Sequence, residues 1–228
     1  MSGDLASIVL PIHNQADHLR LVVEDYVAAL ERTRLAYELV LVPNACRDNT
    51  PAVARTLAER HPCVRVVETE RGGWGHAVRT GLAAARGDLL CYTNSARTGS
   101  EDLTLCLLYA VAHPNIVVKA NRKIREHWSR RLGSLLYNLE CRALFDLACW
   151  DVNGTPKVFP RSMHALLALS RDDDLIDAEF ASICRREGYP MLEVPIFSTR
   201  RHGGRSTTNL TSAANMYVGA YRLWREQR

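Results

Sequence analysis

The stretch Leu89-Leu90-Cys91-Tyr92-Thr93 is followed at once by Asn94-Ser95-Ala96-Arg97, and this change from apolar to polar residues indicates the fold. The first five residues predict a short buried strand over 89–93. On either side of it, residues 75–85 and 101–112 have apolar side chains at helical spacing. A buried strand between two helices is the repeating unit of a parallel sheet, so we expect an α/β fold.

The same alternation extends through the first half of the chain. Further strands are predicted over residues 7–10, 38–42, 64–67 and 116–119, with helices between them. After residue 122 the rhythm changes to helices over 132–147, 161–169, 177–188 and 211–228, a loop and short strand over 151–159, a strand over 191–196 and a loop over 198–208. The pattern predicts a largely parallel sheet covered by helices on both faces.

The composition limits the classes of protein to which the chain can belong. Its 228 residues are 47% hydrophobic, which fits one domain with a proper core, and a net charge of +4 without long basic runs does not indicate nucleic-acid binding. The seven cysteines are scattered and show no C-x-x-C pair, which predicts reduced thiols rather than a zinc site or disulfides. With no visible signal peptide or membrane span, we expect a soluble cytoplasmic protein, free or peripheral to a membrane.

Polar residues follow the first two predicted strands, at the sheet edge where ligands bind in open parallel sheets. Pro11, His13 and Asn14 come directly after the first strand, and Asn44 follows the second. The amide of Asn44 can both donate to and accept from the edge of a nucleotide base. An Asx-turn that caps the next helix explains the same residue equally well. Both interpretations of Asn44 stay open at this point.

A glycine-rich turn follows the third predicted strand and begins the next helix. Gly73 and Gly75 would let the backbone approach a ligand, with free N–H groups at the helix start facing an anion, and Arg79 follows one turn later. The turn resembles a dinucleotide fingerprint only in part. It lacks the full G-x-G-x-x-G spacing, and no acidic residue ends the next strand. A dehydrogenase is therefore disfavoured.

Taken together, segments in order along the chain resemble the inverting glycosyltransferases of family 2, in the dolichyl-phosphate mannose synthase branch. The segments are residues 11–15, 42–50, 73–81, 87–97, 101–103, 119–122, 130–138, 151–159, 174–179, 188–189, 193–196 and 201–206. The resemblance implies the GT-A fold of nucleotide-diphospho-sugar transferases, as a single domain over residues 1–228. Residues 1–122 would bind the nucleotide sugar, 123–208 would form the acceptor half, and 209–228 a C-terminal helix.

The chain departs from this family at the motif that holds a divalent metal. Asn94-Ser95-Ala96 stands where the family has Asp-x-Asp, and Mg²⁺ or Mn²⁺ prefers carboxylate oxygens. The resemblance with this substitution predicts no metal and no cofactor. Arg97 and Arg122 would instead face the diphosphate beside Asn94 and Ser95, because guanidinium groups match phosphate geometry. Surface charge is the alternative explanation for each arginine.

The family implies inverting transfer of a sugar from a UDP- or GDP-linked donor to a hydroxyl or phosphate acceptor. A hydroxyl acceptor would need a base, and the matching positions make Asp177 the first candidate, followed by Asp151 and Asp174. A phosphate acceptor is already anionic and would need none. By the same resemblance, the residues that bind the acceptor or its phosphate are Lys157, Arg201, Arg205 and Ser206.

Three further alternatives stay open. A non-catalytic subunit that binds a sugar nucleotide on the same fold would explain the missing acids. The run Asp172-Asp173-Asp174 could suggest a metal site, although a solvated loop that caps the next helix is the simpler interpretation. Aromatic residues at 217, 221 and 224 of the C-terminal helix could pair in a homodimer. The retained acids and arginines of the acceptor half favour an active transferase.

Overall fold

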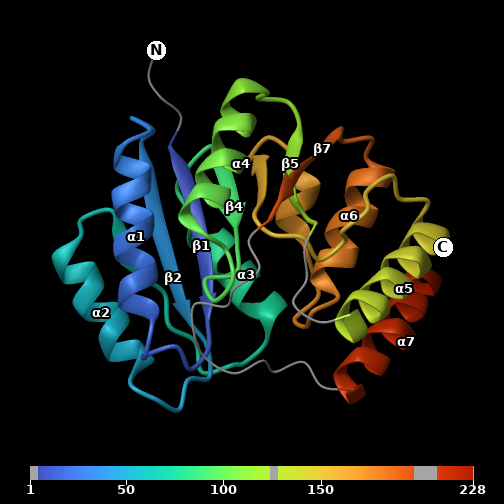
Figure 1. Cartoon of the computed structure of the whole chain (residues 1–228), viewed down its shortest axis with the longest axis horizontal. Coiled ribbons are helices and arrows are strands. Elements are labelled where there is room, and N and C mark those ends of the chain that lie inside the picture. Colours follow the sequence, from blue (N-terminus) through green and yellow to red (C-terminus); the bar gives the residue numbers. More distant parts are fainter. Residues whose placement is uncertain (1–4, 124–127, 198–209, 228) are drawn as a thin grey trace.

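The computed structural model describes residues 5–123, 128–197 and 210–227, which form a central sheet with helices on both sides (Figure 1). The strands are β1 (Ala6–Ile12), β2 (Tyr37–Pro43), β3 (Val64–Val66), β4 (Leu89–Tyr92), β5 (Val117–Arg122), β6 (Lys157–Pro160) and β7 (Met191–Ile196). The helices are α1 (Leu19–Glu31), α2 (Thr50–Arg60), α3 (Trp74–Ala84), α4 (Ser100–Ala112), α5 (Trp128–Phe145), the 3-10 helix η1 (His164–Ala168), α6 (Ile176–Arg186) and α7 (Leu210–Glu226). The expected alternation of strand and helix in the first half of the chain is confirmed.

The seven strands lie in the order β3-β2-β1-β4-β6-β5-β7. β1 pairs in parallel with β2 and β4, β2 pairs in parallel with β3, and β5 pairs in parallel with β7. Only β6 runs antiparallel to its neighbours β4 and β5, among the strands that the structure describes. The predicted largely parallel sheet is therefore confirmed. Because β1, β2 and β4 are parallel, the residues that follow these three strands meet at one edge of the sheet.

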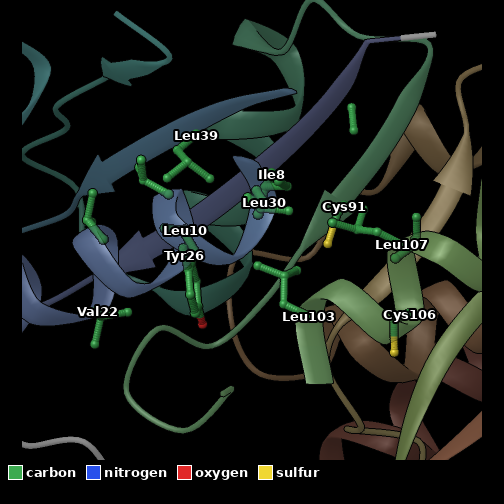
Figure 2. Close-up of a cluster of buried hydrophobic side chains, with 14 of the residues drawn as sticks. Ile8, Leu10, Val22, Tyr26, Leu30, Leu39, Cys91, Leu103, Cys106 and Leu107 are labelled. Carbon is green, nitrogen blue, oxygen red and sulfur yellow. The ribbon is translucent and has the colours of Figure 1, made fainter. Parts of the chain in front are cut away.

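β1 separates two apolar layers, because alternate side chains of a strand point to opposite faces. Ile8 and Leu10 point to the face covered by α1 and α4, where they pack with Tyr26 and Leu103 (Figure 2). Val9 points to the other face, which α3 and α6 cover. All five side chains are buried. The sheet is thus covered on both sides, which explains why its strands are continuous apolar runs in the sequence.

A separate apolar cluster joins α5, α6 and α7 beside the sheet. Tyr137 and Cys141 of α5 pack with Ala220 and Leu223 of α7, and the rings of Tyr137 and Tyr217 meet edge to face with centroids 5.7 Å apart. The two helices lie side by side in Figure 1. The predicted amphipathic C-terminal helix is confirmed by α7. Within the described ranges, none of the helices is long and apolar enough to cross a membrane.

Two predicted elements need correction. Residues 161–169 form only the short 3-10 helix η1, because the buried side chains Met163, Leu166 and Leu169 are three residues apart and a 3-10 helix has three residues per turn. The bond from the Leu166 N–H to the Met163 carbonyl (2.9 Å) shows this geometry. β5 continues to Arg122, past its predicted end at residue 119, because its pairing with β7 extends that far.

Candidate functional site

The loops after β1 and β2 are joined into one rim that holds several of the predicted donor-side residues. His13 Nδ1 lies 2.8 Å from the main-chain oxygen of Asn44, whose N–H donates to the Ile12 carbonyl (2.9 Å). Asn14 has a left-handed backbone (φ 51°), and its amide oxygen accepts the N–H of Arg47 (2.8 Å). The His13 side chain is exposed on this rim. The carboxyl ends of these two strands therefore bring their polar residues together, as expected.

The amide of Asn44 is occupied by backbone partners. The residue is buried, its Nδ2 donates to the Ile12 carbonyl (2.8 Å), and its Oδ1 accepts the Gly73 N–H (3.3 Å). These bonds tie the ends of β1 and β2 to the loop before α3. The geometry favours the structural interpretation of Asn44, and its contact with a nucleotide base stays a prediction.

The turn after β4 completes the rim. The Ser95 hydroxyl donates to Gln15 Oε1 (2.7 Å) and lies 3.5 Å from the Pro11 carbonyl oxygen, so it reaches the loop after β1. The Asn94 amide oxygen accepts the N–H of Ala96 (3.0 Å) in an Asx-turn. A divalent cation between two carboxylates does not fit this donor set, because the one amide oxygen is engaged and Ala96 has none. Across the described ranges, no three or more Asp, Glu, His or Cys residues are grouped to hold a metal.

The start of α3 is covered by a loop of residues 170–173. The main-chain oxygens of Asp172 and Arg171 fill the space in which a Cβ at Gly73 or Gly75 would lie. The His76 N–H donates to the Asp172 carbonyl (3.0 Å). In this structure the two glycines make room for the chain's own loop, whereas the sequence alone suggested a ligand at this place. The helix start already has a backbone carbonyl as its acceptor.

The carboxylate of Asp172 lies among two arginines and a histidine, a grouping that the sequence did not reveal. Arg79 Nη1 donates to Asp172 Oδ1 (2.7 Å), Arg71 pairs with Oδ2, and His76 Nδ1 lies 3.6 Å away. Arg79 also donates to the Ser170 carbonyl (3.0 Å). Arg79 therefore holds a loop of the protein, and its predicted contact with a diphosphate would compete with this pair. We call this arrangement the Asp172 clamp.

Glu179 of α6 fixes the same loop from its other end. Its carboxylate accepts the N–H groups of Ser170 and Arg171, each at 3.0 Å. Asp173 Oδ1 accepts the Leu175 N–H (3.0 Å) and forms a turn that leads into α6. Asp173 and Asp174 are exposed and Asp173 shapes the start of α6, as the loop interpretation predicts, whereas Asp172 is paired with arginines.

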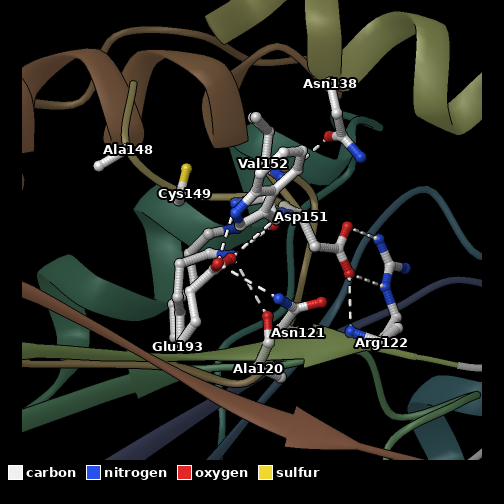
Figure 3. A network of polar contacts seen from close by, with 12 residues as sticks. Ala120, Asn121, Arg122, Asn138, Ala148, Cys149, Asp151, Val152 and Glu193 are labelled. Atoms are coloured by element: carbon white, nitrogen blue, oxygen red, sulfur yellow. Dashed lines mark hydrogen bonds and ion pairs between the residues drawn. The ribbon is translucent and has the colours of Figure 1, made fainter. Parts of the chain in front are cut away.

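Asp151 and Arg122 form a two-pronged ion pair at the end of β5 (Figure 3). Arg122 Nε and Nη2 donate to the two carboxylate oxygens, each at 2.8 Å, and the Arg122 N–H adds a bond of 3.0 Å. Burial lowers the pKa of Arg122, but the charge and hydrogen bonds of buried Asp151 outweigh it and raise that pKa. Arg122 thus already has an anionic partner. Arg97, the other predicted diphosphate ligand, is half-buried beside the Asn94 turn.

Glu193 of β7 anchors the segment that carries Asp151 (Figure 3). The N–H groups of Trp150 and Asp151 donate to its two carboxylate oxygens at 2.9 and 3.1 Å. Lys119 Nζ (3.0 Å) and Asn121 Nδ2 (3.2 Å), both from β5, donate to the same carboxylate. The sequence suggested only that residues 193–196 resemble a family segment. The role of Glu193 as an anchor follows from the parallel pairing of β5 with β7.

Lys157 and Asp177 form a second ion pair, with side chains inside the protein. Lys157 is 0% exposed and Asp177 is 5% exposed, and the Lys157 ammonium contacts Asp177 Oδ1. The Tyr92 hydroxyl donates to the same oxygen (2.9 Å). Burial lowers the pKa of Lys157, and the charge of Asp177 opposes this effect. Asp177 is therefore not placed as an open base, and Lys157 is not placed as an exposed phosphate ligand.

Asp174 is the predicted base whose side chain is exposed. Within the part of the chain that the structure describes, no hydrogen bond or ion pair to its carboxylate is found. The surrounding protein raises the pKa of Asp174 to about 6, and the charges of Asp177 and Asp173 add to this effect. Arg201, Arg205 and Ser206 lie outside the described residues, so their roles stay predictions.

Comparison with known proteins places the chain in a family. Residues 7–164 match the model of glycosyl transferase family 2. The chain is 23% identical over 220 residues to an undecaprenyl-phosphate 4-deoxy-4-formamido-L-arabinose transferase from Sodalis glossinidius, covering 95% of this chain and 66% of that protein. It is 27% identical over 169 residues to the protein of the same name from Pseudomonas paraeruginosa, covering 72% and 50%. The chain thus spans between half and two thirds of the length of these curated relatives.

Solved structures show the same fold. Glucosyl-3-phosphoglycerate synthase from Mycobacterium tuberculosis, in complex with Mn²⁺, UDP and phosphoglyceric acid, superposes with a TM-score of 0.76 at 18% identity, covering 98% of this chain and 79% of that chain. A second mycobacterial protein gives a TM-score of 0.75 at 20% identity, covering 98% and 75%. The expected GT-A type of α/β fold is confirmed. Because the family model matches well over half of its residues, the chain belongs to glycosyl transferase family 2.

Proposed function

We propose that the chain is an inverting transferase that moves a sugar from a nucleoside-diphosphate donor to an acceptor phosphate, without a metal held by an Asp-x-Asp motif. The family match supports the reaction type, because residues 7–164 include the whole rim formed after β1, β2 and β4. The curated relatives are named as transferases that act on undecaprenyl phosphate, and the solved neighbour holds UDP and a phosphorylated acid. Both names support a phosphate-bearing acceptor.

The observation that carries the acceptor class is the pairing of two of the three predicted bases. Asp151 is joined to Arg122, and Asp177 is joined to Lys157 inside the protein. A hydroxyl acceptor needs a base within hydrogen-bond reach, and a carboxylate in a buried ion pair is a poor proton acceptor. A phosphate acceptor carries its own negative charge and attacks without a base. The two pairs therefore favour phosphate over hydroxyl.

The donor would lie along the rim, with its diphosphate near the turn after β4. Charge builds on the leaving nucleoside diphosphate as the sugar bond breaks, so a fixed cation nearby lowers the barrier. Arg97 adjoins the Asn94 turn, and Arg122 ends β5 with a side chain that is about one quarter exposed. We assign the compensation of this charge to these two arginines, of which Arg122 would share its charge between the diphosphate and Asp151. Asn94 adds no negative charge that would repel the donor.

A turnover assay tests the proposal. The protein, a UDP- or GDP-sugar and a short water-soluble polyprenyl phosphate are combined in chelator, and the products are followed by phosphorus NMR. We expect nucleoside diphosphate and a glycosyl phosphodiester with the anomeric configuration opposite to that of the donor. We expect the Asp174→Asn variant to keep its rate within about twofold. A loss of about 100-fold or more with this phosphate acceptor would contradict attack without a base.

A second function is favoured by one of the same observations. If the buried pairs of Asp151 and Asp177 serve only stability, the chain could bind a sugar nucleotide and act as a partner subunit without turnover. Micromolar donor binding, together with no product for any acceptor phosphate or hydroxyl, would support this alternative. Product formation by the purified chain would exclude it.

A further inference from the structure

Helix α5 has one face inside the protein and one apolar face outside it. Its outward side chains Leu132, Leu135, Leu136 and Leu139 are 47–50% exposed. They recur at spacings of three and four residues, which places them in one stripe along the helix. We call these four residues the leucine stripe. Scattered single leucines on a surface are ordinary, but an exposed run on one helix face marks a surface that contacts something apolar.

The inward face of α5 rests on the acceptor half of the candidate site. Asn138 Oδ1 accepts the N–H of Val152 (3.0 Å), next to the Asp151 carboxylate that binds Arg122 (Figure 3). Tyr137 and Cys141 pack in the cluster with α6 and α7. A partner on the leucine stripe would therefore lie about one helix diameter, on the order of 10 Å, from this part of the site.

Charge separates this helix from α4, which also exposes several apolar side chains. α4 exposes Leu105 and Leu108, at 40% and 44%, together with Tyr109 and Val111, but its only charged residues are acidic, Glu101 and Asp102. In sequence, α5 contains arginines at positions 130, 131 and 142 and one glutamate at 140, which leaves two net positive charges, although Arg142 Nη1 donates to the carbonyls of Ala148 and Cys149. Helices that combine a leucine face with arginines lie flat on anionic lipid surfaces. The charge pattern favours α5 for such a surface and disfavours α4.

The size of the stripe decides between a lipid surface and a second copy of the chain. Four half-exposed leucines offer on the order of 350 Å², whereas a stable protein dimer buries about 800 Å² on each partner. A helix at a bilayer surface needs no such area, because apolar insertion and attraction to anionic headgroups act together. α7, which packs beside α5, exposes Tyr221, Arg222 and Arg225. Aromatic and basic groups of this kind suit the headgroup layer.

We propose that the leucine stripe of α5 docks the chain onto an anionic lipid bilayer, which would present a lipid-linked phosphate acceptor beside Asp151 and Arg122. This inference rests on the proposed function for the acceptor, whereas the docking itself does not require turnover. The leucines enter the apolar boundary of the bilayer while Arg222 and Arg225 of α7 contact the headgroup phosphates.

Flotation of the full chain with lipid vesicles tests the proposal. Two vesicle types are compared, phosphatidylcholine alone and phosphatidylcholine mixed with phosphatidylglycerol. The test variant is Leu135→Gln/Leu139→Gln, and the matched control is Leu105→Gln/Leu108→Gln on α4, where two leucines are exposed to a similar extent. Circular dichroism melting checks that both variants fold. We expect the wild type and the control to float with the anionic vesicles, and the partition coefficient of the test variant to fall about tenfold or more.

Three outcomes would overturn the proposal. In the first, the wild type fails to float with anionic vesicles. In the second, the α5 and α4 variants lose vesicle binding equally, which would show that binding does not depend on α5. A dimer seen by sedimentation velocity, dissociated by the α5 variant and unable to float, would show that the stripe binds a second copy.

Calorimetric titration with the donor keeps this proposal separate from the proposed function. Vesicle binding without donor binding would contradict the proposed transferase and support the docking on lipid. Donor binding and turnover without vesicle binding would contradict the docking on lipid and support the transferase.

Discussion

At the ends of β1, β2 and β4 the amides of Asn44 and Asn94 bond to backbone, whereas around β5 and β6 two buried acids are paired with cations. Asn44 and Asn94 in the first region hold loops together. Asp151 and Asp177 in the second region are each joined to a cation. The first region carries neutral amides at positions where the resemblance predicts acids. The second has kept its acids and neutralised them within the fold.

This difference bears on how a diphosphate would be bound. Unit charges a few ångströms apart interact by several kcal/mol at the effective dielectric of a protein surface, about 4 kcal/mol at 4 Å. The amides of Asn44 and Asn94 do not repel the donor, so at these two positions a divalent cation is not needed to bridge acid and phosphate. The acids of the second region also repel the donor little, because each is paired with a cation. We infer that the two regions together make a metal held by carboxylates unnecessary.

The largest effect is expected from breaking a pair in the second region. Lys157→Met leaves Asp177 buried without its cation, and removal of one partner of a buried pair costs about 3–5 kcal/mol of unfolding free energy. Urea denaturation measures this loss. The double variant Lys157→Met/Asp177→Asn should recover most of it, because no uncompensated charge remains. A single variant within about 1 kcal/mol of the wild type would mean that the pair is not buried as described.

The neutral rim can be tested by putting an acid back. Asn94→Asp keeps the turn to Ala96, because a carboxylate oxygen accepts the same N–H, and adds one negative charge near the donor. We expect donor binding in chelator to weaken about tenfold and to recover with Mn²⁺. Asn215→Asp on the exposed part of α7 is the matched control and should change nothing. Equal affinities for both variants would place the diphosphate away from the β4 turn.

The Asp172 clamp should have a smaller effect on stability. Asp172→Asn removes the charge that Arg71 and Arg79 share, and we expect a loss of about 1 kcal/mol, since the three groups are partly exposed. The comparison variant is Glu24→Gln, whose partner Arg20 is at the surface of α1, and it should not change the unfolding midpoint. A clamp variant as stable as the wild type would show that Glu179 alone holds the loop.

The smallest effect concerns the pH dependence of Asp174. Its pKa is raised from 3.8 to about 6, so the folded state holds this proton more tightly than the unfolded state does. The resulting stability is complete below about pH 4 and is lost as pH rises through about 6. Asp174→Asn should remove this loss and gain less than about 1 kcal/mol near pH 7, because solvent screens the exposed carboxylate. The free energy of unfolding is measured by denaturation near pH 4 and pH 7 for the wild type and for Asp174→Asn. An equal change in both proteins between the two pH values would contradict this prediction.

The strands and the rim could be predicted from the sequence because both depend on local pattern. Apolar runs mark the buried strands, and parallel strands carry their following residues, such as His13 and Ser95, to one edge. The Asp172 clamp could not be predicted, because Asp172 is separated from Arg71 by 101 residues and only the packed loop brings them together. The pairing of Lys157 with Asp177 depends on the position of β6 in the sheet. That position could not be predicted from the pattern of parallel strands, because β6 runs antiparallel to β4.

Calorimetric titration of the purified chain with UDP- and GDP-sugars, first in chelator and then with Mg²⁺, tests the central claim most directly. We predict micromolar binding of one donor in chelator, with an affinity that Mg²⁺ changes by less than about threefold. Binding that appears only with Mg²⁺ would contradict the claim that neutral residues at the β4 turn replace a metal held by acids. Absence of binding under both conditions would contradict the assignment of the rim as the donor site.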